Sequence, residues 1–144
     1  MVMLPGGQTN TRLVKSRGRI VVQQGRIALN VPLDLCNYYR QLIYWEFPNL
    51  VGGLSLARHR PHITIGNPKL HKINQAAANK YNNKKVDFEF DPTTIYIGGF
   101  ARGFVGFYVK IISSELDKIK SDVILSELSP GSLHLTICSS KHLL

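Results

Sequence analysis

A His-x-Thr triplet occurs twice in this chain, and each copy lies inside a short apolar run. The first is PHITI at residues 61–65, and the second is LHLTI at residues 133–137. Alternating polar and apolar residues predict a half-buried β-strand, because successive side chains of a strand point to opposite faces. With five histidines in 144 residues, chance rarely produces two such triplets. The pair constrains the fold more than any other feature of the chain.

Each strand presents its polar residues together. In the first triplet His62 and Thr64 share one face, while the isoleucines beside them point to the core. In the second triplet His134 and Thr136 share a face in the same way. If the two strands are neighbours in one sheet, two imidazoles and two hydroxyls meet. We therefore interpret the triplets as two halves of one phosphate site.

The chemistry of such a site suits phosphodiester cleavage beside a ribose hydroxyl. Imidazole, with an ordinary pKa near 6.5, can remove a proton from the attacking oxygen or give one to the leaving oxygen. Threonine hydroxyls can donate to the non-bridging oxygens, where charge builds in the transition state. The sequence shows no carboxylate cluster for a metal, so the prediction is a reaction without metal or other cofactor. For either triplet taken alone, a solvated strand face is the better interpretation; the matched pair favours catalysis.

Other residues are candidates by position. Arg58 and Arg60 precede the first triplet and could neutralise phosphate. Tyr96 and Phe100, near Gly-rich turns, could stack on a base. Cys138 would share the face of the second triplet if that strand continues regularly. The remaining basic residues are interpreted as a solvated or steering surface; they include Lys15, Arg17, Arg19, Lys80, Lys84 and Lys85.

Strands and helices are expected to mix without regular alternation, which predicts an α+β fold. Strands are expected on both sides of a Gln-Gln-Gly turn within 18–33, and at 62–66, 86–92, 94–100, 104–111 and 133–138. Helices are expected over 34–47, 70–83 and 113–128, with Asp34 capping the first and Ser113 or Ser114 the last. A strand, a helix and a His-x-Thr strand follow one another in each half, which suggests an internal pseudo-repeat.

Composition bounds the remaining choices. A chain of this length predicts one domain over 18–144, preceded by a flexible basic arm over 1–17. A net charge of +9 favours polyanionic partners such as nucleic acid or nucleotides. Cys36 and Cys138 show no metal-site spacing and are expected to be buried thiols. Because we find neither a signal peptide nor a membrane span, we expect a soluble, cytoplasmic protein.

The two motifs resemble those of the two-histidine (2H) phosphoesterase superfamily, in style closest to viral 2′,5′-phosphodiesterases. The resemblance directly covers about ten residues, PHITI and LHLTI. It implies a bilobal fold in which two antiparallel-rich sheets surround a central cleft with helices outside. It also implies that His62 and His134 act as general acid and base, and that Thr64 and Thr136 bind phosphate. Only eight residues follow Thr136, so we expect the strand at 20–22 to occupy a position that a C-terminal strand fills in many members.

The function expected from this resemblance is metal-independent cleavage of a small oligonucleotide by a monomeric enzyme. The favoured substrate is 2′,5′-oligoadenylate, which would antagonise antiviral innate immune signalling in a host cytoplasm. The enzymatic alternatives are an RNA 2′,3′-cyclic phosphodiesterase and a cyclic-dinucleotide hydrolase. The non-enzymatic alternative is a basic RNA-binding module. The sequence does not decide which histidine is the acid.

Overall fold

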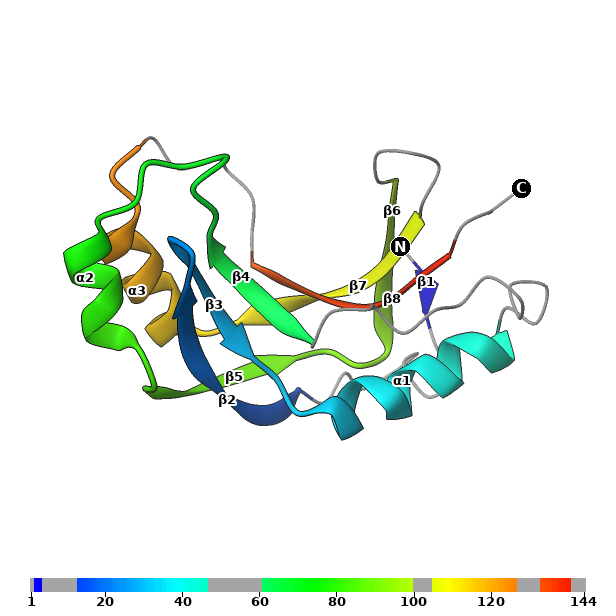
Figure 1. Cartoon of the computed structure of the whole chain (residues 1–144). Helices are drawn as coiled ribbons and strands as arrows, with labels where there is room; N and C mark the ends of the chain where they lie inside the picture. The colour runs from blue at the N-terminus through cyan, green and yellow to red at the C-terminus, as the bar shows by residue number, and fades with distance from the viewer. Residues whose placement is uncertain (1, 4–12, 47–60, 100–104, 127–132, 141–144) are drawn as a thin grey trace.

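The computed structural model describes residues 2–3, 13–46, 61–99, 105–126 and 133–140 (Figure 1). This part of the chain forms a mixed α+β fold. Its helices are α1 (Leu33–Glu46), α2 (Gln75–Tyr81) and α3 (Ser114–Val123). Its strands are β1 (Val2–Met3), β2 (Val14–Gln23), β3 (Arg26–Asn30), β4 (His62–Gly66), β5 (Lys85–Phe90), β6 (Thr94–Gly99), β7 (Val105–Ile112) and β8 (His134–Ser140).

The strands pair in the order β1-β6-β7-β5-β2-β3-β4, and β8 pairs with β7. Every pairing in the described ranges is antiparallel. Both β6 and β5 pair with β7, β6 near its start and β5 at its end. The sheet curls so that β4 and β8 come close to each other, with several of their Cα atoms within 8 Å. The two motif strands are therefore neighbours without forming a hydrogen-bonded ladder in the described residues.

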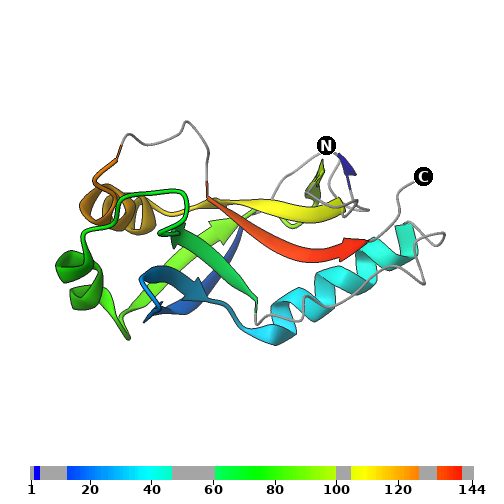
Figure 2. The same cartoon turned by 45° about the horizontal axis from the view of Figure 1, so that its top comes forward.

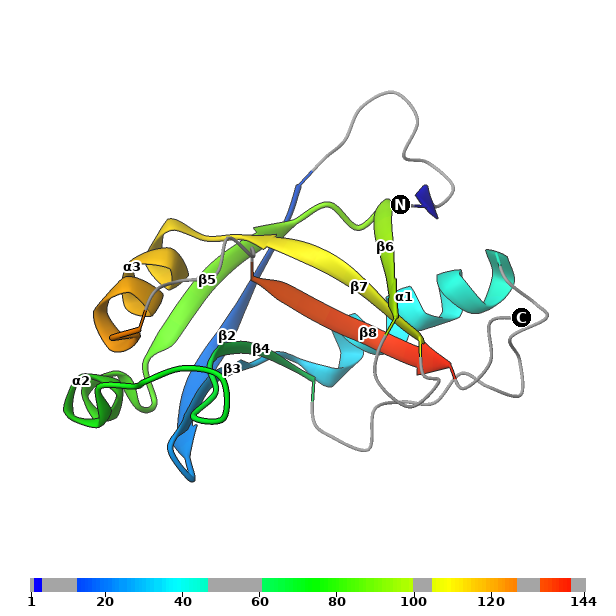
Figure 3. The same cartoon turned by 90° about the horizontal axis from the view of Figure 1, so that it is seen from above.

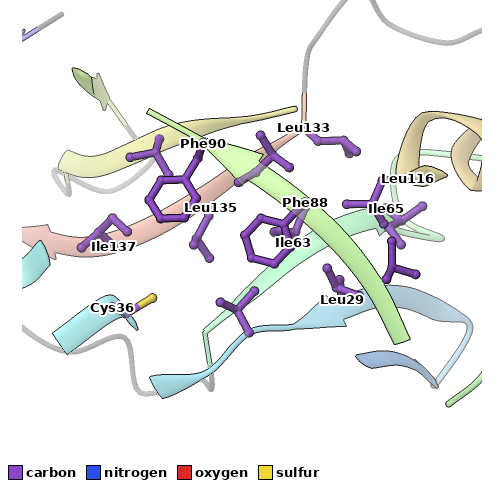
Figure 4. Packing of buried hydrophobic residues seen from close by; sticks show 14 of the residues in the cluster. Leu29, Cys36, Ile63, Ile65, Phe88, Phe90, Leu116, Leu133, Leu135 and Ile137 are labelled. Carbon is purple, nitrogen blue, oxygen red and sulfur yellow. The ribbon is translucent and has the colours of Figure 1, made fainter. Parts of the chain in front are cut away.

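Hydrophobic side chains fill the interior of this curled sheet. Figure 4 shows Phe88 and Phe90 of β5 between the motif strands, close to Ile63 and Leu135. All four are buried, with at most 1% of each residue exposed. Burial of this much apolar surface is the main stabilising contribution to such a fold. It also fixes the faces, because Ile63 and Leu135 point into the core and the residues on either side of each therefore point outward.

The helices lie at opposite ends of the molecule. Figures 1 and 3 show α2 and α3 at one end and α1 at the other. Helix α1 packs against β8, whereas α3 packs against β4 and β5. Figure 2 shows β8 running beside α1 along much of its length. Each motif strand is thus supported by the helix that belongs to the other half of the chain.

The hairpin between β2 and β3 follows from its turn residues. Gln23 pairs with Arg26, which leaves a two-residue loop. Gln24 and Gly25 both have positive φ, at 52° and 78°. Two positive φ values define the tight turn that matches the twist of paired strands, and glycine adopts them at little cost. The expected pair of strands around the Gln-Gln-Gly turn is confirmed.

The described start of the domain differs from the sequence expectation. Residues 14–17, which we assigned to a flexible arm, belong to β2 and pair with residues 87–90 of β5. Val2 and Met3 pair with β6. The alternation of Val14, Ser16 and Gly18 with basic residues is a strand signal that the high polarity of this stretch conceals.

The limits of the helices differ from those that their sequence patterns predict. Asp34 lies in the first turn of α1 and does not precede it. Asn74 caps α2 by accepting a hydrogen bond from the Ala77 amide, so residues 70–73 remain outside the helix. Helix α3 ends at Val123 because Ile124 forms a β-bridge with Ile73. Backbone partners from elsewhere in the fold set these limits, and local propensity could not predict them.

The two halves of the chain repeat one unit: a hairpin, a helix, and a motif strand that pairs with the second strand of the hairpin. The unit is β2-β3-α1-β4 in the first half and β6-β7-α3-β8 in the second. Equivalent hydrogen bonds close both units. The Val31 amide donates to the Pro61 carbonyl, and the Ile111 amide donates to the Leu133 carbonyl, each at 3.0 Å. The geometry therefore supports the expected pseudo-repeat.

Both motif strands contain a bulge at the same place. In β4 the register passes from Thr64 to Gly66, so Ile65 has no partner on β3. Strand β8 behaves alike after Thr136, where Ile137 has no partner on β7. A bulge adds one residue to a strand and breaks the alternation of faces. The match of position indicates that His-x-Thr-Ile is one local structure used twice.

Candidate functional site

The four motif residues lie on the outward side of the sheet. His62 and Thr64 are half-buried, and the residues that follow each of them are fully buried. His134 is exposed and Thr136 is half-buried, again between buried neighbours. This is the alternation expected from the sequence, and it leaves both imidazoles and both hydroxyls on the side away from the core.

The environment of His134 includes the charge of the other motif histidine, His62. The pKa of His134 lies below its ordinary value of 6.5, because burial of part of its ring disfavours the charged form. Although His134 is exposed as a whole, one side of its ring lies against Tyr108. Positive charge on His62, and then on Lys120 of α3, lowers this pKa further. The fold therefore places His62 close enough for its charge to affect His134.

Two tyrosines extend from His134 across the neighbouring strands. The ring of Tyr108 meets the ring of His134 edge-on, with 5.2 Å between centroids. Tyr108 in turn stacks with Tyr96 at 5.6 Å and 21° between planes. Their order follows from the register, since Tyr108 pairs with Thr136 on one side and with Tyr96 on the other. Aromatic rings in such contacts prefer offset or edge-on arrangements.

A lysine completes this group of side chains. Lys110 is the cross-strand partner of His134, and its Nζ lies 4.3 Å from the centroid of the Tyr96 ring. A cation over an aromatic face is attracted by the π electrons of the ring. Because Lys110 is exposed, its charge is available to an anion beside His134. We name Tyr96, Tyr108 and Lys110 the tyrosine–lysine wall.

The wall belongs to one half of the pseudo-repeat only. The positions equivalent to Tyr108 and Lys110 in the first half are Ala28, which pairs with Thr64, and Asn30, which pairs with His62. Neither is aromatic or charged. The surroundings of the two histidines are therefore unlike, although their strands are built alike.

Some candidates from the sequence join this group, and others cannot be placed. Tyr96 lies in the tyrosine–lysine wall, where it stacks with Tyr108, the neighbour of His134. Arg58, Arg60 and Phe100 lie outside the described residues. Sequence reasoning missed Tyr108 and Lys110, although both alternate with buried residues in the stretch 107–111. Their strand was predicted, but only the register shows which motif they accompany.

The structure corrects the conditional expectation for Cys138. The bulge after Thr136 breaks the alternation, and Cys138 pairs with the buried Phe107. The thiol is fully buried, and burial raises its pKa to about 12. A thiol of this kind is inert, because the reactive form is the thiolate.

A hollow of about 680 Å³ lies elsewhere along the sheet. The residues lining it come from β2, β5, the end of β7 and the start of α3, and include Lys15, Arg17, Asp87, Glu89 and Glu115. No motif residue lines it. Its opposite charges are matched in ion pairs, as in Arg17 with Asp87 at 2.5 Å. We therefore do not assign the reaction centre to this hollow.

Two further findings, on metal-binding groups and on membrane-spanning helices, concern the described ranges as a whole. They contain no group of three or more His, Cys, Asp or Glu side chains arranged to hold a metal ion. Among them, no helix combines the length and the apolar character needed to cross a bilayer.

Comparison with known proteins yields no relative. No family model, no curated protein and no solved structure matches this chain. The case for a function therefore depends on the residues and their geometry.

Proposed function

We propose that this chain is a metal-independent phosphodiesterase of the two-histidine type, acting on small oligonucleotides. The observation that carries the proposal is the placement of His62 and His134 on neighbouring strands of identical local structure, where the charge of one affects the other. Two imidazoles beside one phosphate can supply both proton transfers of the reaction. The bilobal arrangement implied by the resemblance is part of this proposal.

The proposed reaction begins with the proton on a ribose hydroxyl next to the phosphodiester. One imidazole removes this proton, and the oxygen attacks phosphorus to form a new P–O bond. The bond from phosphorus to the departing 5′ oxygen breaks, and the other, protonated imidazole gives its proton to that oxygen. The products are a 2′,3′-cyclic phosphate end and a free 5′ hydroxyl. Thr64 and Thr136 donate hydrogen bonds to the non-bridging oxygens as negative charge builds on them.

The unlike surroundings of the histidines suggest their roles. A general base must be neutral, and the lowered pKa of His134 favours the neutral imidazole at pH 7. We therefore assign His134 as the base and His62 as the acid in the forward direction. Lys110, which lies over the Tyr96 ring, would contribute positive charge beside the phosphate on this side.

The favoured substrate is 2′,5′-oligoadenylate, with antagonism of antiviral signalling as the consequence. This choice of linkage rests on the resemblance to compact viral enzymes. An RNA 2′,3′-cyclic phosphodiesterase and a cyclic-dinucleotide hydrolase use the same two-histidine chemistry and are the enzymatic alternatives. The alternative without catalysis is a basic RNA-binding module, which the net charge of +9 supports.

A substrate panel in EDTA tests the proposal. The full chain is incubated with 2′,5′-oligoadenylate, 3′,5′-oligoadenylate, 2′,3′-cyclic AMP and a cyclic dinucleotide, and products are separated by chromatography. We expect turnover of 2′,5′-oligoadenylate. We also expect His62→Ala and His134→Ala each to reduce the rate by about 100-fold or more, the contribution typical of a general acid or base.

The matched control is His71→Gln, which changes a histidine outside both motifs and should keep full activity. Turnover of another substrate in the panel would show that the proposed 2′,5′ linkage is wrong, and would leave the two-histidine mechanism in place. Tight RNA binding without product from any substrate would overturn the enzyme in favour of the binding module. Activity that disappears in EDTA would contradict the metal-free mechanism.

A further inference from the structure

The outward face of β2 carries three basic residues at alternate positions. Their cross-strand partners on β5 differ in charge. Lys15 lies opposite Glu89, with 3.9 Å between Nζ and a carboxylate oxygen. Arg17 lies opposite Asp87 and forms a closer ion pair. The third pair breaks this pattern, because Arg19 lies directly opposite Lys85. Two of the three cross-strand pairs are complementary in charge, and the third is not.

Like charges directly opposite each other destabilise a sheet. Arg19 and Lys85 are both exposed, and neither has an ion pair within the described ranges. The adjacent Lys84 pairs with Glu115 at 3.1 Å, so this carboxylate already has a partner. Local stability does not explain the Arg19–Lys85 pair, whereas an anion held between the two side chains would.

The register connects this pair to the candidate site. Arg19 pairs with Asn30 on β3, and Asn30 pairs with His62 on β4. Cross-strand partners point to the same side of a sheet, so Lys85, Arg19, Asn30 and His62 form one row. With strands about 4.8 Å apart, Arg19 lies roughly 10 Å from the strand of His62, and Lys85 roughly 14 Å. In an extended oligonucleotide, a phosphate one or two nucleotides from the phosphate at His62 can lie at such a distance.

We propose that Arg19 and Lys85 form a distal phosphate subsite, which holds a phosphate one or two nucleotides away from the bond between His62 and His134. This inference rests on the proposed function and narrows its substrate class. A cyclic mononucleotide has no second phosphate to reach the subsite, whereas a phosphorylated oligonucleotide has. Guanidinium and ammonium groups together are well suited to phosphate oxygens. Asn30 lies between the two anion positions and can form hydrogen bonds with the intervening ribose.

Binding measurements can test the subsite apart from catalysis. The probes are two fluorescently labelled 2′,5′-linked adenylates, a dimer that lacks a 5′-phosphate and so has a single phosphate, and a 5′-phosphorylated tetramer, titrated by anisotropy against the His62→Ala protein. In this background we expect Arg19→Ala and Lys85→Ala each to weaken tetramer binding about tenfold, the size of a lost charge-assisted hydrogen bond. Dimer binding should change less than about twofold. The salt dependence of tetramer binding should fall by about one unit of slope per cation removed.

The ladder offers matched controls of its own. Arg17→Ala and Lys15→Ala remove cations that are also exposed but already have carboxylate partners, and should change tetramer binding less than about twofold. Lys85→Glu should pair with Arg19 and remove the preference for the tetramer while keeping a long side chain. Thermal unfolding of each variant verifies that the sheet is intact.

The outcomes separate this inference from the proposed function. If Arg17→Ala weakens tetramer binding as much as Arg19→Ala, the cations act as a general field and the subsite is overturned. If Arg19→Ala or Lys85→Ala weakens dimer binding and tetramer binding equally, the subsite is also overturned, even where the wild-type protein cleaves both compounds. If the variants weaken tetramer binding selectively while the wild-type protein cleaves no substrate of the panel, that combination supports the subsite and overturns the catalytic proposal.

Discussion

At the scale of single residues, His134 has the most unusual environment in the candidate site. One side of its ring lies on Tyr108, and the positive groups that lower its pKa come from β4 and α3. Lys110 lies opposite it on β7. Burial of the ring and the charges of His62 and Lys120 disfavour the imidazolium form, and a bound phosphate would favour it. Proton affinity at this position should therefore depend on whether an anion is present.

A titration can test this environment. In the free protein we expect the pKa of His134, followed by NMR of the imidazole, to lie below 6.5. In His62→Ala it should rise toward 6.5 and remain below it, because burial is the larger cause and persists. Inorganic phosphate should raise it in the wild-type protein. His71→Gln is the control and should leave the curve unchanged; an equal curve in His62→Ala would contradict the electrostatic contact.

Prediction from sequence succeeded for the residues whose placement relative to the core depends on local pattern. The outward placement of His62 and His134 follows from alternation in a short strand, and it is confirmed. The contribution of Tyr108 could not be predicted, because it depends on pairing between β7 and β8. The same holds for Arg19, whose link to His62 passes through two ladders. Arg58 and its neighbours remain predictions outside the described residues.

At the scale of elements, α3 shows how a cap connects a helix to the sheet. Ser113 Oγ accepts a hydrogen bond from the Leu116 amide at 3.1 Å and donates one to the Asp87 carbonyl at 2.9 Å. Ser113 is buried, whereas Ser114 is exposed. The sequence left both serines open as caps, and the contact with β5 selects Ser113.

Ser113→Ala removes the cap and takes the Ser113 hydroxyl away from the partly buried hydrogen bond with the Asp87 carbonyl. We expect the free energy of unfolding, measured with urea, to fall by about 1–2 kcal/mol. The control is Ser114→Ala, which should change it by less than about 0.5 kcal/mol because the side chain is exposed. Equal effects of the two substitutions would mean that Ser113 does not cap the helix.

Close packing explains why certain glycines occupy the ladder around the site. A Cβ on Gly18 would come within 2.3 Å of the Asn30 carbonyl oxygen. A Cβ on Gly66 would come within 2.8 Å of Ile124. A strand pattern predicts neither need, because each arises where another segment approaches the backbone.

At the scale of the whole molecule, the α+β class was predictable and the path of the sheet was not. Mixed periodicities in the chain favour α+β. The curled sheet depends on β7 pairing with β8, β6 and β5, and on β2 pairing with both β3 and β5. Such long-range pairings are chosen by the combined packing of the core and leave no local signal.

The buried thiols can report on opening of the whole molecule. Cys36 of α1 and Cys138 of β8 are fully buried, and burial raises the pKa of Cys36 to about 11 and that of Cys138 to about 12. For Cys138 a change from 9.0 to about 12 lowers the thiolate fraction about a thousandfold. We expect neither thiol to react with a disulfide reagent at pH 8 until urea unfolds the protein.

Both thiols should then react at one rate, because α1 and β8 pack together. Single variants Cys36→Ala and Cys138→Ala identify the two signals and serve as controls. Faster labelling of Cys36 alone in low urea would show that α1 separates before the sheet opens.

The bulge after each threonine interrupts the series of outward side chains on its strand. Beyond that point the chain has changed sides, so a polar residue at position 66 or 138 would be turned into hydrocarbon. A motif strand therefore presents two consecutive outward side chains, one histidine and one threonine, before the series is interrupted. The difference between the surroundings of the two histidines therefore comes from the adjoining strands, where Ala28 and Asn30 of β3 correspond to Tyr108 and Lys110 of β7.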